Sequence, residues 1–169
     1  MAEPGPKKQF ALDTNILIDL GGKNHFAEEF IGFFRENGFC IYVPPTVVIE
    51  LGLLTEIRGK EELARDALLT IPKYRLLPFE MRTVGDDIAD NFYRILTTKG
   101  LLPYEEKRDG EILAETSLHG IPILITRDAH LLNIEETDLA LAFNEADLNH
   151  VKVIHPRDMI KAAQRVLGK

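Results

Sequence analysis

Short apolar runs alternate along the chain with longer segments in which apolar residues recur at helical spacing. The short runs predict five strands, at residues 10–13, 40–43, 75–77, 121–125 and 151–154. The longer segments predict helices at residues 26–36, 46–58, 61–69, 81–99, 107–119, 129–132 and 156–166. This alternation is typical of an α/β domain whose mainly parallel sheet is covered by helices on both faces. Such sheets bind ligands beyond the carboxyl ends of their strands.

No repeat, low-complexity segment or linker divides the chain. We therefore expect a loose tail over residues 1–8 and one domain over residues 9–169. The phenylalanines of the predicted helix 26–36 form a stripe that is interpreted as core, with a dimer face as the alternative. The pattern predicts no definite helix or strand for residues 133–150. This segment is acidic, and it either shapes access to a site or forms solvated surface.

Composition narrows the class of protein. Of the 169 residues, 45% are hydrophobic and 28% are charged, as in an ordinary globular protein. No apolar run approaches the roughly 20 residues that a membrane helix needs, and Met1 to Lys8 lack the apolar stretch of a signal peptide. Cys40 is the only cysteine, which excludes an internal disulfide and a thiolate metal site. We expect a cytoplasmic protein with no membrane segment.

The net charge is −7, from 20 Lys and Arg against 27 Asp and Glu. Proteins that grip nucleic acid through its phosphates are usually basic. The charge balance therefore argues mildly against a nucleic-acid partner.

Two aspartates lie at the carboxyl ends of predicted strands. Asp13 ends the strand at residues 10–13, and Asp128 follows the run Ile123 to Ile125, with Thr126 two residues before it. Each aspartate could serve only as the N-cap of the next helix. Their shared position at the carboxyl edge of the sheet makes them candidate site residues.

Two further acids map to the same edge. Glu50 lies one turn into the helix after the second strand, among apolar neighbours that predict a mostly buried helix. A buried carboxylate needs a partner, a shifted pKa or a cation, and a structural salt bridge is the alternative. Asp109 lies near the start of the helix that leads into the strand 121–125. By itself, Asp109 is better explained as a solvated acid in the polar run of residues 105–111.

Four acids that are distant in sequence thus converge on one edge of one predicted sheet. Clustered carboxylates repel one another, and a hard divalent cation relieves the repulsion. Ligation by oxygen alone suits Mg²⁺ or Mn²⁺, which also take phosphate oxygens. Such an ion can orient a water and stabilise a phosphodiester under attack. Arg108 and Arg127 adjoin two of the acids and could contact a phosphate backbone, with solvated surface charge as the alternative.

Other catalytic patterns are absent from the sequence. The five histidines lack HxxxH and HExxH spacing, and there is no Walker A loop, GxGxxG or GxSxG. A zinc site, a nucleotide-binding loop and a serine nucleophile are therefore not expected.

The order and spacing of several stretches resemble the PIN domain family of VapC-like, metal-dependent ribonucleases. The matching stretches are residues 11–17, 44–51, 108–128 and 153–160. The resemblance implies a PIN-like three-layer α/β/α sandwich with a five-stranded, mainly parallel sheet. It places Asp13, Glu50, Asp109 and Asp128 on the family's four acidic positions, and Asn15 and Thr126 on supporting polar positions.

The resemblance also implies a function. Family members hold Mg²⁺ or Mn²⁺ in an acidic pocket and hydrolyse single-stranded RNA, leaving a 5′-phosphate. By this likeness, Asp13, Asp109 and Asp128 would hold the metal, and Glu50 would complete the catalytic pocket. Many members are toxins held silent by an antitoxin protein, and many are homodimers. The longer middle segment, residues 56–104, departs from the compact toxins, so a toxin role is less well supported than the fold.

Two rival functions stay open at this point. The chain could be a PIN-like module that binds RNA or protein without cleavage, although all four acids are present. It could instead be a phosphatase or phospho-receiver with Asp13 as phosphate acceptor. Those proteins place a lysine after a later strand, whereas this chain has Thr126-Arg127-Asp128 there.

Overall fold

The computed structural model describes residues 8–168. The described residues form five strands, namely β1 (Gln9–Leu12), β2 (Cys40–Val43), β3 (Leu77–Pro78), β4 (Ile123–Ile125) and β5 (Lys152–Ile154). They also form nine helices: α1 (Thr14–Gly21), α2 (His25–Glu36), α3 (Pro45–Leu54), α4 (Glu61–Lys73), α5 (Thr83–Thr98), α6 (Lys107–Leu118), α7 (Ala129–Leu132), α8 (Glu136–Glu145) and α9 (Pro156–Leu167). The tail predicted for residues 1–8 lies outside the described residues except for Lys8, whose carbonyl accepts from the Cys40 amide.

The strands form one parallel sheet in the order β3-β2-β1-β4-β5. β1 is central, with Phe10 opposite Ile41 of β2 and Leu12 opposite Ile125 of β4. The prediction of a five-stranded parallel sheet is confirmed. The strand order reverses at β1, so β1 and β4 are neighbours in the sheet. Ligands bind at such a reversal, beyond the carboxyl ends of the two strands.

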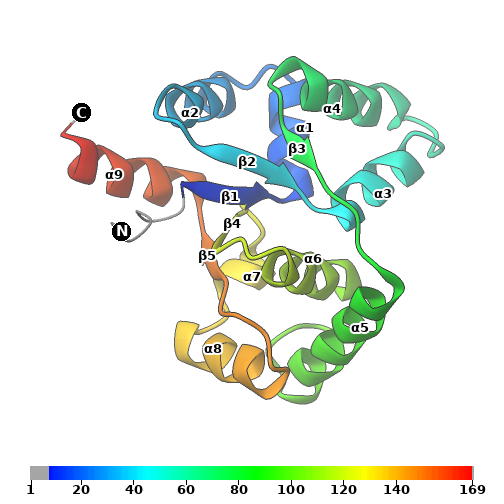
Figure 1. The fold of residues 1–169 in the computed structure, drawn as a ribbon. Coiled ribbons are helices and arrows are strands. Elements are labelled where there is room, and N and C mark those ends of the chain that lie inside the picture. The colour runs from blue at the N-terminus through cyan, green and yellow to red at the C-terminus, as the bar shows by residue number, and fades with distance from the viewer. Residues whose placement is uncertain (1–7, 169) are drawn as a thin grey trace.

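Helices cover both faces of the sheet. In Figure 1, α1, α2 and α4 lie above the strands, and α5, α6 and α8 lie below them. The side chains between these layers form one core, including the fully buried Phe10, Leu12 and Leu124. This is the expected three-layer α/β/α arrangement. Burial on both sides explains why the strands are continuous apolar runs.

The phenylalanine stripe of α2 belongs to the core. Phe30 and Phe34 are fully buried, and Phe26 and Phe33 are partly buried against the core. The ring of Phe10 in β1 meets Phe34 edge-on at a centroid distance of 5.2 Å. The interpretation of this stripe as core is confirmed.

Several predicted boundaries are wrong, and three of them show what moved the boundary. The helix predicted to reach residue 58 ends at Leu54, where the Thr55 hydroxyl donates to the Gly52 carbonyl and a turn leads to Gly59 at φ 88°. The next helix continues past residue 69 to Lys73. Arg75 adopts φ 53°, which is incompatible with an extended strand, so β3 begins only at Leu77.

The predicted burial of the Glu50 helix is also wrong in part. Of the residues in α3, Thr46, Val47 and Leu51 are buried, but Ile49 is 59% and Leu53 is 48% exposed. The helix packs on α4 and α6 along one side and leaves the other side open. An apolar sequence therefore did not guarantee burial all round.

The acidic segment 133–150 contains a packed helix. Leu139 and Phe143 of α8 are buried, and the Phe143 ring stacks on Phe92 of α5 at 4.5 Å. Most of its acids point to solvent, which fits the interpretation as solvated surface. None of the described helices combines the length and apolar character that crossing a membrane requires.

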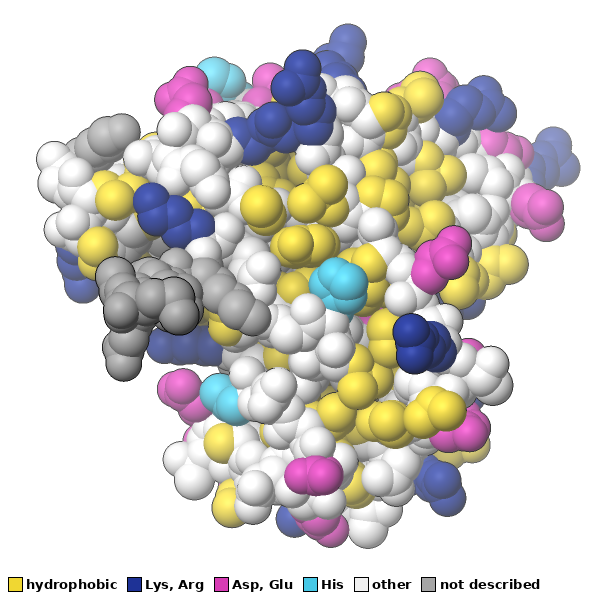
Figure 2. Space-filling view, in the orientation of Figure 1, with side chains coloured by type: hydrophobic (Ala, Val, Ile, Leu, Met, Phe, Trp, Pro, Cys, Tyr) yellow, Lys and Arg dark blue, Asp and Glu magenta, His cyan; other side chains and the backbone are white. Residues whose placement is uncertain are grey.

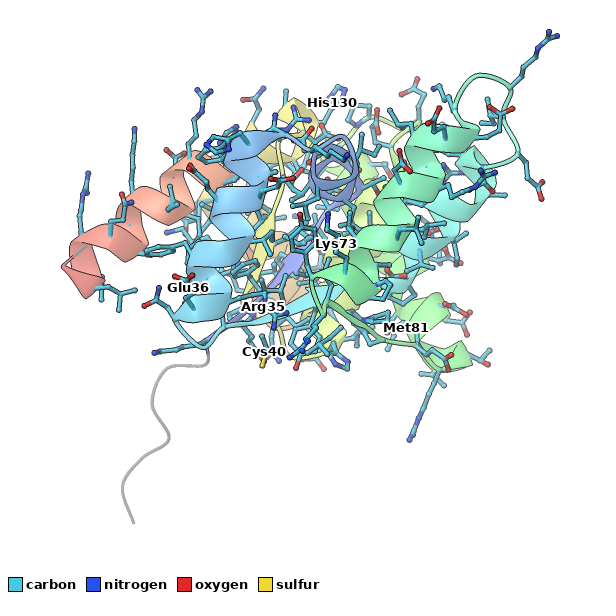
Figure 3. All side chains as sticks on the ribbon, turned by 90° about the horizontal axis from the view of Figure 1, so that it is seen from above. Arg35, Glu36, Cys40, Lys73, Met81 and His130 are labelled. Carbon is cyan, nitrogen blue, oxygen red and sulfur yellow. The ribbon has the colours of Figure 1, made fainter. Side chains whose placement is uncertain are left out.

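The two edges of the sheet differ in character. Figure 3 shows Cys40, the first residue of β2, and His130 of α7 at opposite edges of the molecule. Figure 2 shows hydrophobic side chains gathered over β2 and β3 and again over α5, where Leu77 is 41% and Val84 is 68% exposed. The candidate acids lie beyond the carboxyl ends of the strands, which is the edge marked by His130.

Candidate metal centre

The four predicted acids line one cavity of about 590 Å³. They reach it from four separate segments, which follow β1, follow β2, begin α6 and follow β4. The lining residues are Asp13, Thr14, Asn15, Ile18, Glu50, Glu105, Glu106, Lys107, Arg108, Asp109, Glu111 and Asp128. The convergence that the sequence predicted is therefore present in the structure.

Asp13 is held rigidly at the floor of this acidic pocket. It is 3% exposed and caps α1, with Oδ1 accepting from the Thr14 amide at 2.7 Å. Its Oδ2 accepts from the Thr126 hydroxyl at 2.6 Å. Burial raises the pKa of Asp13 to about 6, against the lowering effect of these two hydrogen bonds.

Asn15 and Thr126, which the family resemblance places on supporting polar positions, both lie in contact with the aspartates. The Asn15 amide nitrogen lies 3.3 Å from Oδ2 of Asp13 and 3.2 Å from the Thr126 hydroxyl oxygen. The Thr126 hydroxyl also accepts from the Asp128 backbone amide at 3.0 Å. One fully buried threonine thus links the ends of β1 and β4.

Glu50 occupies the rim rather than the floor. Its side chain is 25% exposed, and Oε1 lies 4.0 Å from Nη1 of Arg108. Oε2 accepts from the Thr14 hydroxyl at 2.8 Å, which ties α3 to the first turn of α1. Glu50 therefore has a hydrogen-bond donor and a loose ion pair, both inside the acidic pocket.

Asp109 is the least satisfied of the four acids. It is 8% exposed, and its Oδ2 is a buried atom without a hydrogen-bond partner among the described residues. Burial, together with the charges of Asp13 and Asp128, raises the pKa of Asp109 to about 9. An unpartnered buried carboxylate oxygen is costly, so this atom favours binding of a cation.

Asp128 completes a compact group with these two aspartates. It caps α7, and its Oδ1 accepts from the His130 amide at 2.8 Å. One carboxylate oxygen from each of Asp13, Asp109 and Asp128 lies within 4.8 Å of the others. Three carboxylates at this spacing could share a divalent cation. The charge repulsion and the orphan oxygen of Asp109 both fit that occupant.

The two predicted backbone-contacting arginines flank the acids. Arg108 is half exposed and lies on the Glu50 side. Arg127 donates from Nε and Nη2 to the two carboxylate oxygens of Asp19, at 2.6 and 2.8 Å. Its backbone amide donates to Oδ1 of Asn15 at 3.1 Å.

Several residues at the site were not singled out from the sequence. Thr14 orients Glu50, and Asp19 holds Arg127. Asp19 lies one helical turn after Asn15, so i, i+4 spacing could have placed it on the same face. Glu106 and Glu111, which the sequence analysis did not single out, also line the acidic pocket.

A second buried acid, Glu115, lies elsewhere on α6. It is 5% exposed, and its two carboxylate oxygens accept from the amide and hydroxyl of Thr46, at 3.0 and 2.6 Å. Burial raises the pKa of Glu115 to about 7, despite these hydrogen bonds. The Thr46 oxygen also lies 3.3 Å from Glu111. We call Glu115, Glu111 and Thr46 the Glu115 cluster.

Solved structures share this architecture. VapBC2 from Rickettsia felis, bound to a DNA fragment from its promoter, is 14% identical, with a TM-score of 0.60 over 87% of this chain and 98% of that chain. VapBC-1 from nontypeable Haemophilus influenzae is 16% identical, with a TM-score of 0.58 over 88% and 98% of the two chains. FitAcB from Neisseria gonorrhoeae is 20% identical, with a TM-score of 0.50 over 87% and 97%.

The chain has a PIN-like fold. No family model and no curated protein matches the sequence. The similarity therefore lies in the arrangement of helices and strands. The PIN-like fold accounts for the shared edge at which Asp13 and Asp128 meet, because β1 and β4 are neighbours in it.

Proposed function

We propose that this protein is a metal-dependent endoribonuclease that hydrolyses phosphodiester bonds of single-stranded RNA in the cytoplasm. The observation that carries the proposal is the trio of the buried Asp13 and Asp109 and the partly buried Asp128, in which one carboxylate oxygen of Asp109 has no hydrogen-bond partner among the described residues. The PIN-like fold and the family resemblance support the choice of reaction.

The three aspartates would hold Mg²⁺ or Mn²⁺, because both prefer oxygen ligands. When bound, such an ion lowers the pKa of a water and stabilises the negative charge of a phosphodiester under attack. Thr126 and Asn15 keep the carboxylates in place through hydrogen bonds. Glu50, held by Thr14, would orient the attacking water by accepting its hydrogen bond.

The basic side chains would position the substrate. Arg108 and Lys107 line the acidic pocket beside Asp109, and Arg127 lies on the far side of Asp128. Contacts from these side chains to phosphates would fix the strand without reading its sequence. With a net charge of −7, the rest of the protein would add little nonspecific affinity.

A cleavage assay tests the proposal. We expect purified protein to cut an unstructured RNA in Mn²⁺ but not in EDTA, leaving 5′-phosphate ends. Asp13→Asn should reduce the rate by about 100-fold or more, because it removes a metal ligand. Asp13→Asn that cleaves as fast as wild type would overturn the catalytic assignment. The alternative, a module that binds RNA without cleavage, predicts affinity for RNA and no products.

We also propose a toxin that is controlled by an antitoxin protein and forms a homodimer. The similar VapBC and FitAcB structures support a partner of this kind. Apolar side chains of α3 and α4 are exposed, including Ile49 at 59% and Leu69 at 58%, and a protein partner would cover such residues. Growth arrest on expression, absent in Asp13→Asn, would support the toxin role. Unchanged growth under the same expression would contradict it.

A further inference from the structure

A second cavity, of about 390 Å³, lies beside the acidic pocket on the other side of α1. We call it the Arg127 pocket. It is lined by Ile16, Asp19, Asn24, Phe26, Ala27, Phe30, Arg127, His155, Pro156 and Arg157. These residues come from α1, α2, the turn after β4 and the start of α9. The volume lies in the range of about 300–1,000 Å³ that small-ligand sites occupy.

The Arg127 pocket is coupled to the acidic pocket through one short segment. Arg127 immediately precedes Asp128, and its amide donates to Asn15, which in turn contacts Asp13. Asn15 lines the acidic pocket, whereas Asp19, one turn later in α1, lines the Arg127 pocket. A single-stranded nucleic acid that crossed the carboxyl edge of the sheet would pass from one cavity directly into the other.

Hydrogen-bond donors dominate the rim of the Arg127 pocket. Arg127 has N–H groups left after its two bonds to Asp19, and the pair cancels the charge of that carboxylate. Arg157 is exposed. His155 accepts from the Arg157 amide at Nδ1, which leaves Nε2–H as a donor in the neutral ring. A protein with a net charge of −7 thus concentrates two arginines and a histidine around one hollow.

Apolar side chains also line the Arg127 pocket. Phe26 is half-buried on α2, Pro156 is buried at the start of α9, and Ala27 of α2 also lines the pocket. A ligand with an anionic group and a flat apolar face would match both kinds of lining side chain. Arginines contact phosphates, and aromatic side chains contact nucleobases without demanding a particular sequence.

We propose that the Arg127 pocket binds the nucleotide next to the scissile phosphate of a single-stranded RNA. Its phosphate would lie on Arg127 and Arg157, and its base against Phe26 and Pro156. This proposal rests on the proposed ribonuclease function and assigns a second substrate-binding site to it. Arg157 would be a substrate-binding residue that takes no part in bond cleavage.

Two charge reversals on the same helix test the proposal. Arg157→Glu places an acid in the Arg127 pocket, and Arg165→Glu makes the same charge change two turns later, on an exposed position. Affinity for a fluorescein-labelled, eight-nucleotide unstructured RNA would be measured by anisotropy in EDTA. Steady-state cleavage of the same RNA would be measured in Mn²⁺.

For Arg157→Glu, we expect Kd and KM to rise by about tenfold, as for the loss of a charge-assisted hydrogen bond, with kcat unchanged. Arg165→Glu should bind and cleave as wild type does. If both variants change RNA affinity equally, net charge is the cause and the proposal is overturned. If Kd and KM are unchanged in both variants, the proposal is also overturned. That result would fit a protein partner in this pocket.

The anisotropy measurement separates this proposal from the ribonuclease function. If wild type does not cleave but Arg157→Glu selectively weakens RNA binding, the nucleotide site stands and hydrolysis is wrong. If wild type cleaves and Arg157→Glu does not alter binding, hydrolysis stands and the site is wrong. Arg157→Gln, which only neutralises the charge, should show a smaller effect in the same direction, and thermal melting of each variant checks folding.

Discussion

The acidic pocket and the Glu115 cluster both bury carboxylates against α6, yet they differ in how those carboxylates are satisfied. Glu115 receives two hydrogen bonds from Thr46, so both of its oxygens have donors from the protein itself. Asp109, six residues earlier on α6, retains a buried oxygen without a hydrogen-bond partner among residues 8–168 and lies near two further aspartates. Burial raises the pKa of both side chains.

Burial and a raised pKa therefore do not identify a ligand site by themselves. A buried acid whose oxygens all accept hydrogen bonds from the protein needs no ligand. It contributes to packing and to the pH dependence of stability. A buried acid that the fold leaves unsatisfied, among like charges, indicates a group supplied from outside. Matched substitutions in the acidic pocket and in the Glu115 cluster therefore test the site more sharply than any single substitution.

The largest difference should appear on adding Mn²⁺. At pH 8 and saturating Mn²⁺, the melting temperature of wild type should rise by about 5–10 °C, measured by differential scanning fluorimetry. At pH 6 the rise should be smaller, because protons compete for Asp13 and Asp109, whose pKa values are raised to about 6 and 9.

Paired variants complete that measurement. Asp109→Asn should abolish the Mn²⁺-induced rise, whereas Glu115→Gln should retain it in full. A rise that survives Asp109→Asn and disappears in Glu115→Gln would show that the metal binds at the wrong cluster for the proposed function.

A smaller effect is expected for Glu115→Gln on metal-free stability. The pKa of Glu115 is about 7 in the fold, above the ordinary value of 4.5. The folded state therefore holds the proton more tightly, and stability falls as pH rises from about 4.5 through 7. Glutamine carries no titrating proton, so at pH 8 it should raise the free energy of unfolding by about 1–2 kcal/mol. Urea titrations at pH 5 and pH 8 would measure this gain, and an equal gain at both pH values would contradict it.

The smallest effect is expected for Thr46→Val. Valine keeps the branched shape but removes the hydroxyl that donates to Glu115 at 2.6 Å, leaving only the backbone donor. The loss should cost about 1 kcal/mol of unfolding free energy. The cost should be larger at pH 8 than at pH 5, because an ionised Glu115 depends more on its donors. Equal values at the two pH values would show that the hydroxyl does not stabilise the carboxylate.

Much of the architecture followed from local pattern. The strands at Cys40–Val43 and Ile123–Ile125 and the parallel arrangement were predictable, because a sheet covered on both faces needs continuous apolar runs. Errors fell where tertiary contacts or backbone geometry overrode the pattern. Arg75, at φ 53°, delays β3, and Ile49 lies exposed although its helix is apolar.

For the site, the sequence predicted that Asp13, Glu50, Asp109 and Asp128 share one edge, since strand ends and helix starts meet there in parallel sheets. It singled out Asp109 by its position at the start of the helix, but neither spacing nor composition reveals that Glu115 is buried as well or which hydrogen-bond partners each acid has. Only the tertiary structure placed Thr46 against Glu115 and left Asp109 facing two aspartates. This placement depends on how α3 and β4 pack against α6. It makes Glu115 an acid with hydrogen-bond donors from the protein and Asp109 an acid that needs a cation.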